Sequence, residues 1–203
     1  MTKLFITGIG TDIGKTVVSA ILVEKLKADY WKPVQSGELD NSDTMKVKAL
    51  VSNSLSVFHP ESYRLNTALS PHHSAKIDSI TIDPSKIIVP ETSNQYLVIE
   101  GAGGLMVPLN DEYLVIDLAS DLNAEIILVS KAYLGSINHT LLSIDAIKQR
   151  NLPLRGIIFN GNANPESEEL ILKYSGIKCI GSIPQAANLD KKFVSDCGSL
   201  IEI

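Results

Sequence analysis

The segment LFITGIGTDIGKTVVSA, residues 4–20, combines the residue types that bind a phosphate group. A short apolar run is followed by a loop that contains three glycines, Gly8, Gly10 and Gly14. Glycines allow backbone N–H groups to turn towards an anion, and a helix that begins after Gly14 adds the positive end of its dipole. Lys15 can reach the outer phosphates of a nucleotide, and the Thr16 hydroxyl can bind Mg²⁺. The order of strand, loop and helix therefore predicts a P-loop.

The spacing of this loop departs from the usual pattern at one position. Four residues normally separate the first glycine from Gly-Lys-Thr, and Ile9 stands where that glycine would be. An ordinary glycine-rich turn between a strand and a helix is the alternative. The first strand of a doubly wound sheet is the usual place for a nucleotide loop, so the position in the chain favours nucleotide binding.

The composition limits the class of protein. The chain has 203 residues, of which 44% are hydrophobic and 20% charged, and this predicts one globular domain over residues 1–203. A net charge of −5 disfavours nucleic acid as the main partner. Cys179 and Cys197 are too far apart for a Cys-x-x-Cys pair, as expected of reduced thiols. The sequence shows neither a signal peptide nor a membrane-spanning apolar run, so we expect a cytoplasmic protein without a membrane partner.

Apolar strands alternate with helices along the chain. We expect strands at residues 4–7, 30–34, 96–100, 125–129, 154–159 and 178–183. We expect helices at residues 15–27, 41–51 (with Ser42 as the cap), 136–149 and 165–174, one more within residues 84–94, and a loop at residues 59–74. This pattern predicts an α/β protein with a doubly wound, mostly parallel sheet of the P-loop NTPase type and helices on both faces. Ligands of such sheets bind at the carboxyl ends of the strands.

Polar residues follow several of these strand ends. Glu100 ends a buried strand directly before Gly-Ala-Gly-Gly, where P-loop enzymes carry an acid near the metal. With Thr16 and Asp43 it would form an oxygen shell suited to Mg²⁺. Asp43 taken alone is more typical of a solvated acid at a helix start than of a metal ligand. Lys32 could be a surface lysine, but its place at the ligand edge indicates a cation that faces phosphates.

The segment LGSINHT, residues 134–140, opens the helix at residues 136–149. Its free backbone N–H groups could bind a carboxylate, and simple capping by Ser136 is an equally good interpretation. His72, His73 and His139 lack the spacing of metal ligands, and we interpret them as non-ligands.

Eight short segments occur in one order along the chain: GIGTDIGKT, KPVQSG, NSD, LSPHHSA, EGAGG, LGSINHT, FNGN and GSIP. Together they resemble the dethiobiotin synthetase family, from Thr7 to about Asn188. The resemblance implies a homodimeric ligase of biotin biosynthesis that uses 7,8-diaminopelargonic acid (7,8-diaminononanoate), CO₂, ATP and Mg²⁺. One amine captures CO₂ as a carbamate, ATP phosphorylates the carbamate, and the second amine closes the ring of dethiobiotin.

The resemblance also implies a role for each matching residue. The catalytic residues would be Lys15, Lys32 and Thr11, and the metal ligands Thr16, Asp43 and Glu100. The diamine would contact Ser36 and Gly103, and its carboxylate would lie at Gly135, Ser136, Ile137 and Asn138 of the second subunit. ATP would contact Asp12, Ile13, Gly14, Lys15, Thr16, Val17, Asp43, Glu100, Gly101, Ala102, Gly103, Asn160, Gly161, Ser182, Ile183 and Pro184.

Two positions depart from the family, and two other families are weighed against it. Asp12 stands where glutamate is common, and Tyr133 stands where some members carry a basic residue. Partition or switch ATPases of the ParA/MinD group carry an additional lysine in the loop, where this chain has Gly10, and the net charge of −5 indicates an acidic surface rather than a DNA-binding one. Amidotransferases of the cobyrinic-acid type need a glutaminase domain, for which 203 residues leave no room.

Overall fold

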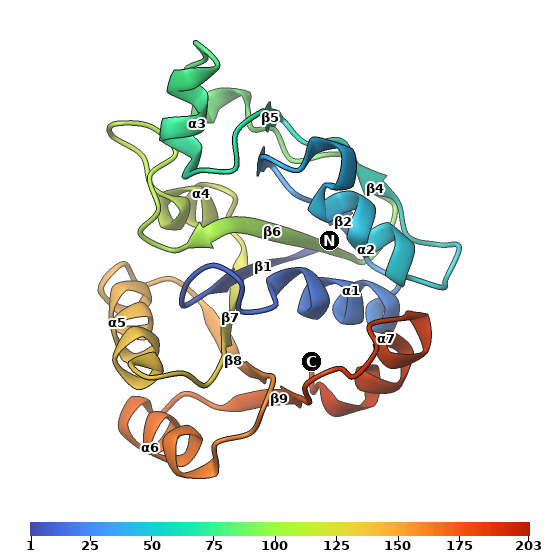
Figure 1. Cartoon of the computed structure of the whole chain (residues 1–203), viewed down its shortest axis with the longest axis vertical. Coiled ribbons are helices and arrows are strands. Elements are labelled where there is room, and N and C mark those ends of the chain that lie inside the picture. Colours follow the sequence, from blue (N-terminus) through green and yellow to red (C-terminus); the bar gives the residue numbers. More distant parts are fainter.

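Seven strands form one sheet in the order β4-β2-β6-β1-β7-β8-β9, and every neighbouring pair is parallel (Figure 1). The computed structural model describes residues 1–203. The strands are β1 (Thr2–Gly8), β2 (Asp29–Trp31), β4 (Phe58–His59), β6 (Tyr96–Gly104), β7 (Glu125–Ser130), β8 (Leu154–Asn160) and β9 (Cys179–Ile183). The predicted parallel sheet is confirmed, with β1 and its phosphate loop at the centre.

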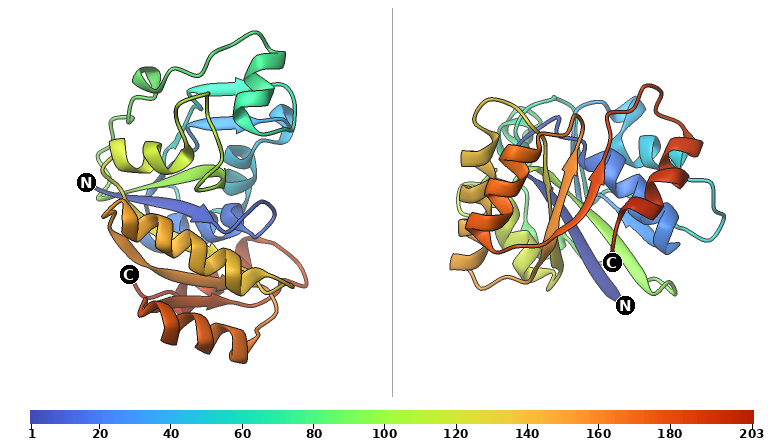
Figure 2. Two further views of the ribbon diagram at one scale, coloured as in Figure 1. Left: turned by 90° about the vertical axis from the view of Figure 1, so that its left-hand side faces the viewer. Right: turned by 90° about the horizontal axis from the view of Figure 1, so that it is seen from below.

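Helices cover both faces of the sheet, as Figure 2 shows. They are α1 (Lys15–Leu26), α2 (Asp43–Leu50), α3 (Pro71–Ile77), α4 (Val115–Asp121), α5 (Ser136–Gln149), α6 (Pro165–Ser175) and α7 (Lys191–Cys197). Side chains of β1 alternate between the faces, because Leu4 and Ile6 pack with α1, α2 and α7 whereas Phe5 packs with α4 and α5. Helix α6 covers the same face as α5, through Ile171. None of the helices combines the length and apolar character that crossing a bilayer requires.

Helix α1 is buried over most of its length. It packs between α2 and α7, so every residue from Val18 to Glu24 is shielded from solvent. This burial fixes the helix that follows the phosphate loop. The loop therefore starts from a strand in the middle of the sheet and ends on a helix that is held on both sides.

The strand predicted at residues 30–34 is divided in two. Strand β2 ends at Trp31, and Pro33 separates it from β3 (Val34–Ser36), which pairs with β5 (Tyr63–Leu65) in a small second sheet. Proline has no backbone N–H to donate, so it ends the ladder with β6 at this point. The split turns the chain out of the main sheet and carries Ser36 away from it.

Two further predictions were wrong. Residues 59–74, expected as a loop, contain β5 and the first half of α3. The helix expected within residues 84–94 is only a single 3₁₀ turn at Pro84–Lys86, followed by irregular chain that includes Pro90. Helices α4 and α7 were not predicted. The other predicted helices and strands agree with the structure to within a few residues.

Candidate active site

The phosphate loop lies between β1 and α1 and is supported by the end of β8. Gly14 has a φ of +92°, and a side chain there would overlap the side chain of Asn160. The Asn160 amide donates a hydrogen bond of 2.9 Å to the carbonyl oxygen of Ile13. No side chain caps the N-terminus of α1, so its first N–H groups are available to an anion. The loop has the geometry that phosphate binding requires.

Lys15 lies across this loop, mostly buried, and its ammonium group donates to the carbonyl oxygen of Gly10 at 2.9 Å. Burial lowers the pKa of Lys15, and the neighbouring charge of Glu100 opposes that shift only in part. The ammonium group therefore has one polar partner within the loop, and the nearby charge of an anion would stabilise its protonated form.

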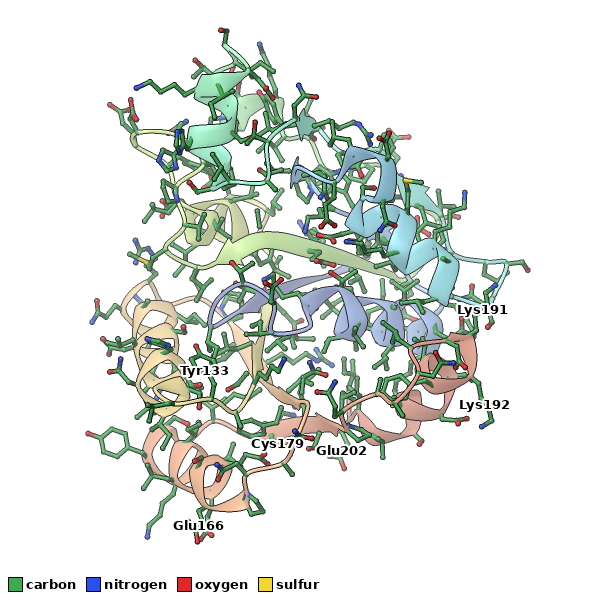
Figure 3. All side chains as sticks on the ribbon, in the orientation of Figure 1. Tyr133, Glu166, Cys179, Lys191, Lys192 and Glu202 are labelled. Carbon is green, nitrogen blue, oxygen red and sulfur yellow. The ribbon has the colours of Figure 1, made fainter.

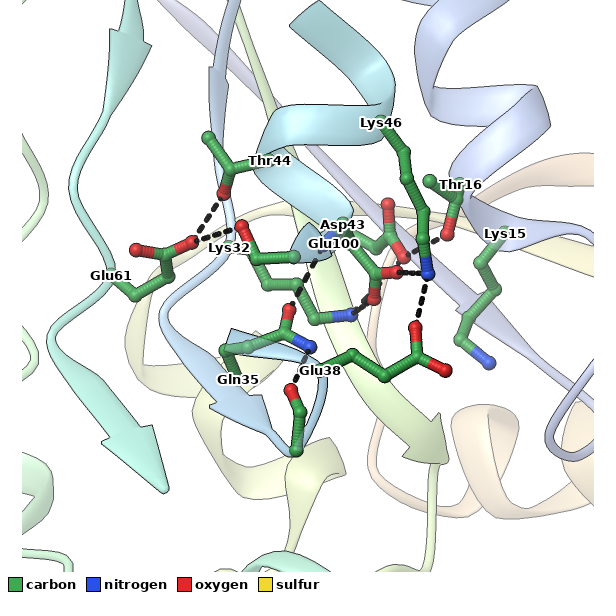
Figure 4. A network of polar contacts seen from close by, with 12 residues as sticks. Lys15, Thr16, Lys32, Gln35, Glu38, Asp43, Thr44, Lys46, Glu61 and Glu100 are labelled. Carbon is green, nitrogen blue, oxygen red and sulfur yellow. Dashed lines mark hydrogen bonds and ion pairs between the residues drawn. The ribbon is translucent and has the colours of Figure 1, made fainter. Parts of the chain in front are cut away.

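Glu100 lies within β6, fully buried, and both of its carboxylate oxygens accept hydrogen bonds. Its Oε1 accepts from the Thr16 hydroxyl at 2.9 Å and from the Lys32 ammonium group at 3.2 Å. Its Oε2 accepts from the Tyr30 hydroxyl at 2.9 Å. Figure 4 shows the side chains of Thr16, Lys32 and Glu100 pointing toward one another from α1, from the end of β2 and from β6. Glu100 thus connects the phosphate loop to the lysine.

Lys32 is buried between Glu100 and Asp43 and forms an ion pair with each. Burial alone would lower the pKa of Lys32, but the negative charges of the two carboxylates and their hydrogen bonds outweigh it and raise the pKa. The alternative interpretation of Lys32 as a solvated surface lysine is therefore wrong. Lys32 remains a cation in the folded protein.

Asp43 is the first residue of α2, and Ser42 caps this helix as predicted by accepting from the N–H of Met45. Burial raises the pKa of the Asp43 carboxyl, but the charge of Lys32 outweighs this effect and the pKa is lowered. Asp43 is thus a paired, half-buried carboxylate and not a solvated acid at a helix start. With Thr16 and Glu100 it offers only oxygen donors, which is the ligand set that Mg²⁺ prefers.

The glycines after Glu100 lie beside the phosphate loop. Strand β6 continues through Gly101, Ala102, Gly103 and Gly104, and its last residue is paired with Gly8 of β1. A Cβ on Gly104 would lie 3.2 Å from the Gly8 carbonyl oxygen, a tight contact, so the close approach of the two segments favours glycine. On the opposite side of the site, the hydroxyl oxygen of Ser36 is buried without a hydrogen-bond partner. Like the buried hydroxyls of Thr7 and Ser19, it lacks a partner within the chain and is free to accept one from outside.

The residues predicted to bind the nucleotide base lie together at the ends of β8 and β9. Asn160 is paired with Ile183, and the N–H of Gly161 donates to the Ile183 carbonyl oxygen at 2.8 Å. Ser182 and Pro184 on either side are exposed. A small hollow beside them is lined by Ser130, Ser136, Asn160, Gly161 and Ser182, among others. Among the loop residues, Thr11 and Asp12 are exposed, Ile13 is buried and Val17 lies in the first turn of α1.

Residues 135–138 form the N-terminus of α5, and no hydrogen bond or ion pair joins them to the cluster of Lys32 and Glu100. Gly135 is the cap residue with a φ of +102°, and no side chain caps the helix, so the capping interpretation of Ser136 was wrong. An open groove runs along this helix start, lined by residues 132–138 together with Asn164 and Ser167. Within one chain, these residues stand apart from the cluster of Lys32 and Glu100, whereas Ser136 lines the hollow that Asn160 and Ser182 also line.

Sequence reasoning missed several side chains of this network. Tyr30 precedes Lys32 by two residues, and within the strand predicted at residues 30–34 such residues point the same way, so that spacing could have revealed it. Gln35, Glu38 and Lys46 surround Asp43, but no motif marks their role.

A family model described as an AAA domain matches residues 2–192. The ATP-dependent dethiobiotin synthetase BioD of Christiangramia forsetii is 54% identical over 192 residues, covering 95% of this chain and 92% of that protein. The protein of the same name from Cytophaga hutchinsonii is 48% identical and covers 96% and 94%. The chain belongs to the dethiobiotin synthetase family. The family assignment that the eight short segments indicate is thereby confirmed.

Solved structures outside the dethiobiotin synthetase family share this fold. MinD of Pyrococcus horikoshii, solved with Mg-ADP, has a TM-score of 0.63 at 16% identity and covers 96% of this chain and 85% of its own. A ParA family ATPase of Chlorobium tepidum has a TM-score of 0.60 at 14% identity, covering 98% and 99%. At such low identity the likeness shows the fold alone, and it confirms the predicted P-loop architecture.

Proposed function

We propose that this chain converts 7,8-diaminopelargonic acid, CO₂ and ATP into dethiobiotin, ADP and phosphate, as an ATP-dependent ligase of biotin biosynthesis. The observation that carries the proposal is the buried carboxylate of Glu100, which joins Thr16 of the phosphate loop to Lys32. This contact gathers a cation and oxygen ligands beside a nucleotide loop in a member of the dethiobiotin synthetase family. The consumption of ATP supports a cytoplasmic location, and the continuous seven-stranded sheet supports a single domain over residues 1–203.

The phosphate groups would bind at the uncapped N-terminus of α1, between the loop N–H groups and Lys15. Lys15 would exchange its contact with the Gly10 carbonyl for the outer phosphates. Asn160, Gly161 and Ser182 to Pro184 would surround the base at the ends of β8 and β9.

The metal would be held by Thr16, Asp43 and Glu100. When bound there, Mg²⁺ neutralises charge on the phosphate oxygens of the nucleotide. The all-oxygen donor set supports this assignment, and the hydrogen bond between Thr16 and Glu100 already brings two of the three ligands together.

Lys32 would stabilise negative charge, first on the carbamate and then on the phosphoryl group during transfer. One amine of the diamine adds to CO₂ and loses a proton, which gives the carbamate. The carbamate oxygen attacks the terminal phosphorus of ATP and ADP leaves. The second amine then attacks the carbonyl carbon and expels phosphate. The raised pKa of Lys32 favours electrostatic stabilisation over proton abstraction, because the ammonium group has no free electron pair.

The diamine would lie between the phosphate loop and β3. The unpartnered hydroxyl of Ser36 supports a contact with it, and Thr11 and Gly103 would also contact the diamine. The carboxylate of the diamine would lie at residues 135–138 of the partner subunit in a homodimer. Exposure of Tyr133 and Leu134 beside this helix start supports an interface there.

A labelling assay tests the reaction. The protein is incubated with labelled bicarbonate, Mg²⁺, the diamine and ATP, and each reactant is omitted in turn. Label is expected in dethiobiotin only when all are present, with one ADP formed for each ring closed. ATP hydrolysis that needs no diamine and is stimulated by DNA would contradict the proposal and favour a partition ATPase.

A further inference from the structure

Gln35 is buried beside Asp43 and uses both ends of its side chain. Its Oε1 accepts from the backbone N–H of Asp43 at 3.2 Å, and its Nε2 donates to the carbonyl oxygen of Gly37 at 3.0 Å (Figure 4). One side chain therefore connects the first turn of α2 to the loop that follows β3. Gln35 lies next to Ser36 in the chain.

A second connection lies on the more exposed side of the same helix turn. Lys46 forms an ion pair with Glu38, and its Nζ lies 3.6 Å from Oδ1 of Asp43. Lys32 contacts the other oxygen of the same carboxylate. The two oxygens of Asp43 thus face two different ammonium groups, and only that of Lys46 belongs to α2.

The loop that follows β3, beginning at Gly37, has an unfavourable backbone conformation. Gly37 has a φ of +72°, and a side chain there would overlap the backbone of Ala68. Glu38 follows with a φ of +51°, a left-handed conformation that costs free energy in a residue other than glycine. Contacts outside the loop must hold residues 36–38 in this shape, and Gln35 and Lys46 supply such contacts.

We propose that Gln35, with the Glu38–Lys46 ion pair as a second connection, couples diamine binding to nucleotide binding by fixing Ser36 relative to Asp43. The inference depends on the proposed function, in which Ser36 contacts the diamine and Asp43 the metal of the nucleotide. Gln35 and Lys46 are positioning residues, because their polar groups contact the loop and α2. By linkage, each ligand strengthens the binding of the other by the same factor.

Calorimetry on the purified protein tests this coupling. The dissociation constant of the diamine is measured with and without Mg²⁺ and a non-hydrolysable ATP analogue. We expect the analogue to strengthen diamine binding about fivefold or more in the unaltered protein. Gln35→Leu removes both hydrogen bonds at nearly constant volume and is expected to abolish most of that factor. Gln149→Leu, at the exposed end of α5, is the matched control and should leave the factor unchanged.

A second variant covers the case in which Gln35→Leu does not fold. Lys46→Gln removes a partly exposed ion pair with Glu38. It is expected to reduce the coupling factor at least twofold, which is the size of effect that one surface ion pair typically has. Lys192→Gln breaks an exposed ion pair with Asp196 within α7, where Figure 3 labels Lys192, and serves as its control because neither residue contacts the loop after β3.

The outcomes separate the inference from the proposed function. An unaltered protein that binds both ligands independently would overturn the inference, as would full coupling in both Gln35→Leu and Lys46→Gln. An unaltered protein that binds the ATP analogue and shows no affinity for the diamine would instead overturn the proposed function.

Discussion

Thr16 donates a hydrogen bond of 2.9 Å to the buried carboxylate of Glu100, which follows it by 84 residues in the chain. The contact is possible because β1 and β6 are neighbours in the sheet, so the end of one strand faces the middle of the other. A substitution at Glu100 of β6 is therefore expected to affect the phosphate loop through Thr16.

Replacement of Lys32 by alanine separates catalysis from nucleotide binding. Lys32 contacts Glu100 and Asp43, whereas Lys15 lies in the loop itself, so we expect Lys32→Ala to retain ATP binding and to lower the rate of ring closure about 100-fold or more. Lys15→Ala is expected to weaken ATP binding directly. Calorimetry for ATP and a dethiobiotin assay measure the two effects. Lys48→Ala, an exposed lysine of α2, is the control, and normal turnover in Lys32→Ala would remove that lysine from the mechanism.

Tyr30→Phe tests the second oxygen of Glu100. The phenol is fully buried, and burial and then the charge of Glu100 raise its pKa, so it remains a neutral donor. Its loss leaves a buried carboxylate oxygen without that partner, and we expect the free energy of unfolding to fall by about 1.5–3 kcal/mol. Urea denaturation measures the change. Tyr174→Phe, at an exposed position, should alter stability by less than about 0.5 kcal/mol, and an equal loss in both variants would contradict the expected role.

Glu24 is expected to contribute to acid sensitivity. Burial raises its pKa, but hydrogen bonds from Lys27, Asn53 and Ser52 outweigh that effect and lower the pKa from 4.5 to about 2. Because the pKa is depressed on folding, the stabilisation is present above the ordinary value and is lost as the pH falls towards 2.

The matching experiment compares Glu24→Gln with the unaltered protein by urea denaturation between neutral and acid pH. The difference in unfolding free energy between them should be largest at neutral pH and should shrink in acid. Glu166→Gln, at the exposed start of α6, is the control and should show a small difference at every pH. A difference that stays constant with pH would show that the Glu24 hydrogen bonds do not depend on its charge.

The shared site of the proposed dimer can be tested by mixing subunits. Lys32→Ala disables the site of its own subunit, and Gly135→Val places a branched residue at a φ of +102°, which distorts the helix start offered to the partner. Each variant alone should be nearly inactive. An equal mixture, unfolded and refolded together, should recover about a quarter of normal activity, because half of the dimers then contain one intact site. No recovery would mean that both elements serve the same subunit.

The main sheet could be predicted from the sequence because its strands are long apolar runs. Leu4, Val98 and Ile127 belong to such runs, and burial on both faces of a parallel sheet demands them. Glu100 was identified for the same reason, since a carboxylate inside an apolar run is costly unless it has a function. Its contact with Thr16 follows from the strand order, which the sequence implies only in general terms.

The rest depends on tertiary contacts. Strands β3 and β5 have three residues each, too few for a periodic pattern, and they pair only because Pro33 turns the chain away from β2. Helices α4 and α7 have seven residues each, which is barely two turns. Gln35 occupies an unremarkable position in a motif, and its role depends on the fold that brings Asp43 to it.

The overlap between position 14 and the Asn160 side chain has a consequence for the history of the family. A substitution at Gly14 would need both a tolerated left-handed backbone and a smaller residue at position 160. A single substitution at position 14 would clash with the Asn160 side chain. A single substitution at position 160 would lose the hydrogen bond to the carbonyl oxygen of Ile13. The two sites should therefore be inherited as a unit, and lineages that alter one are expected to have altered the other.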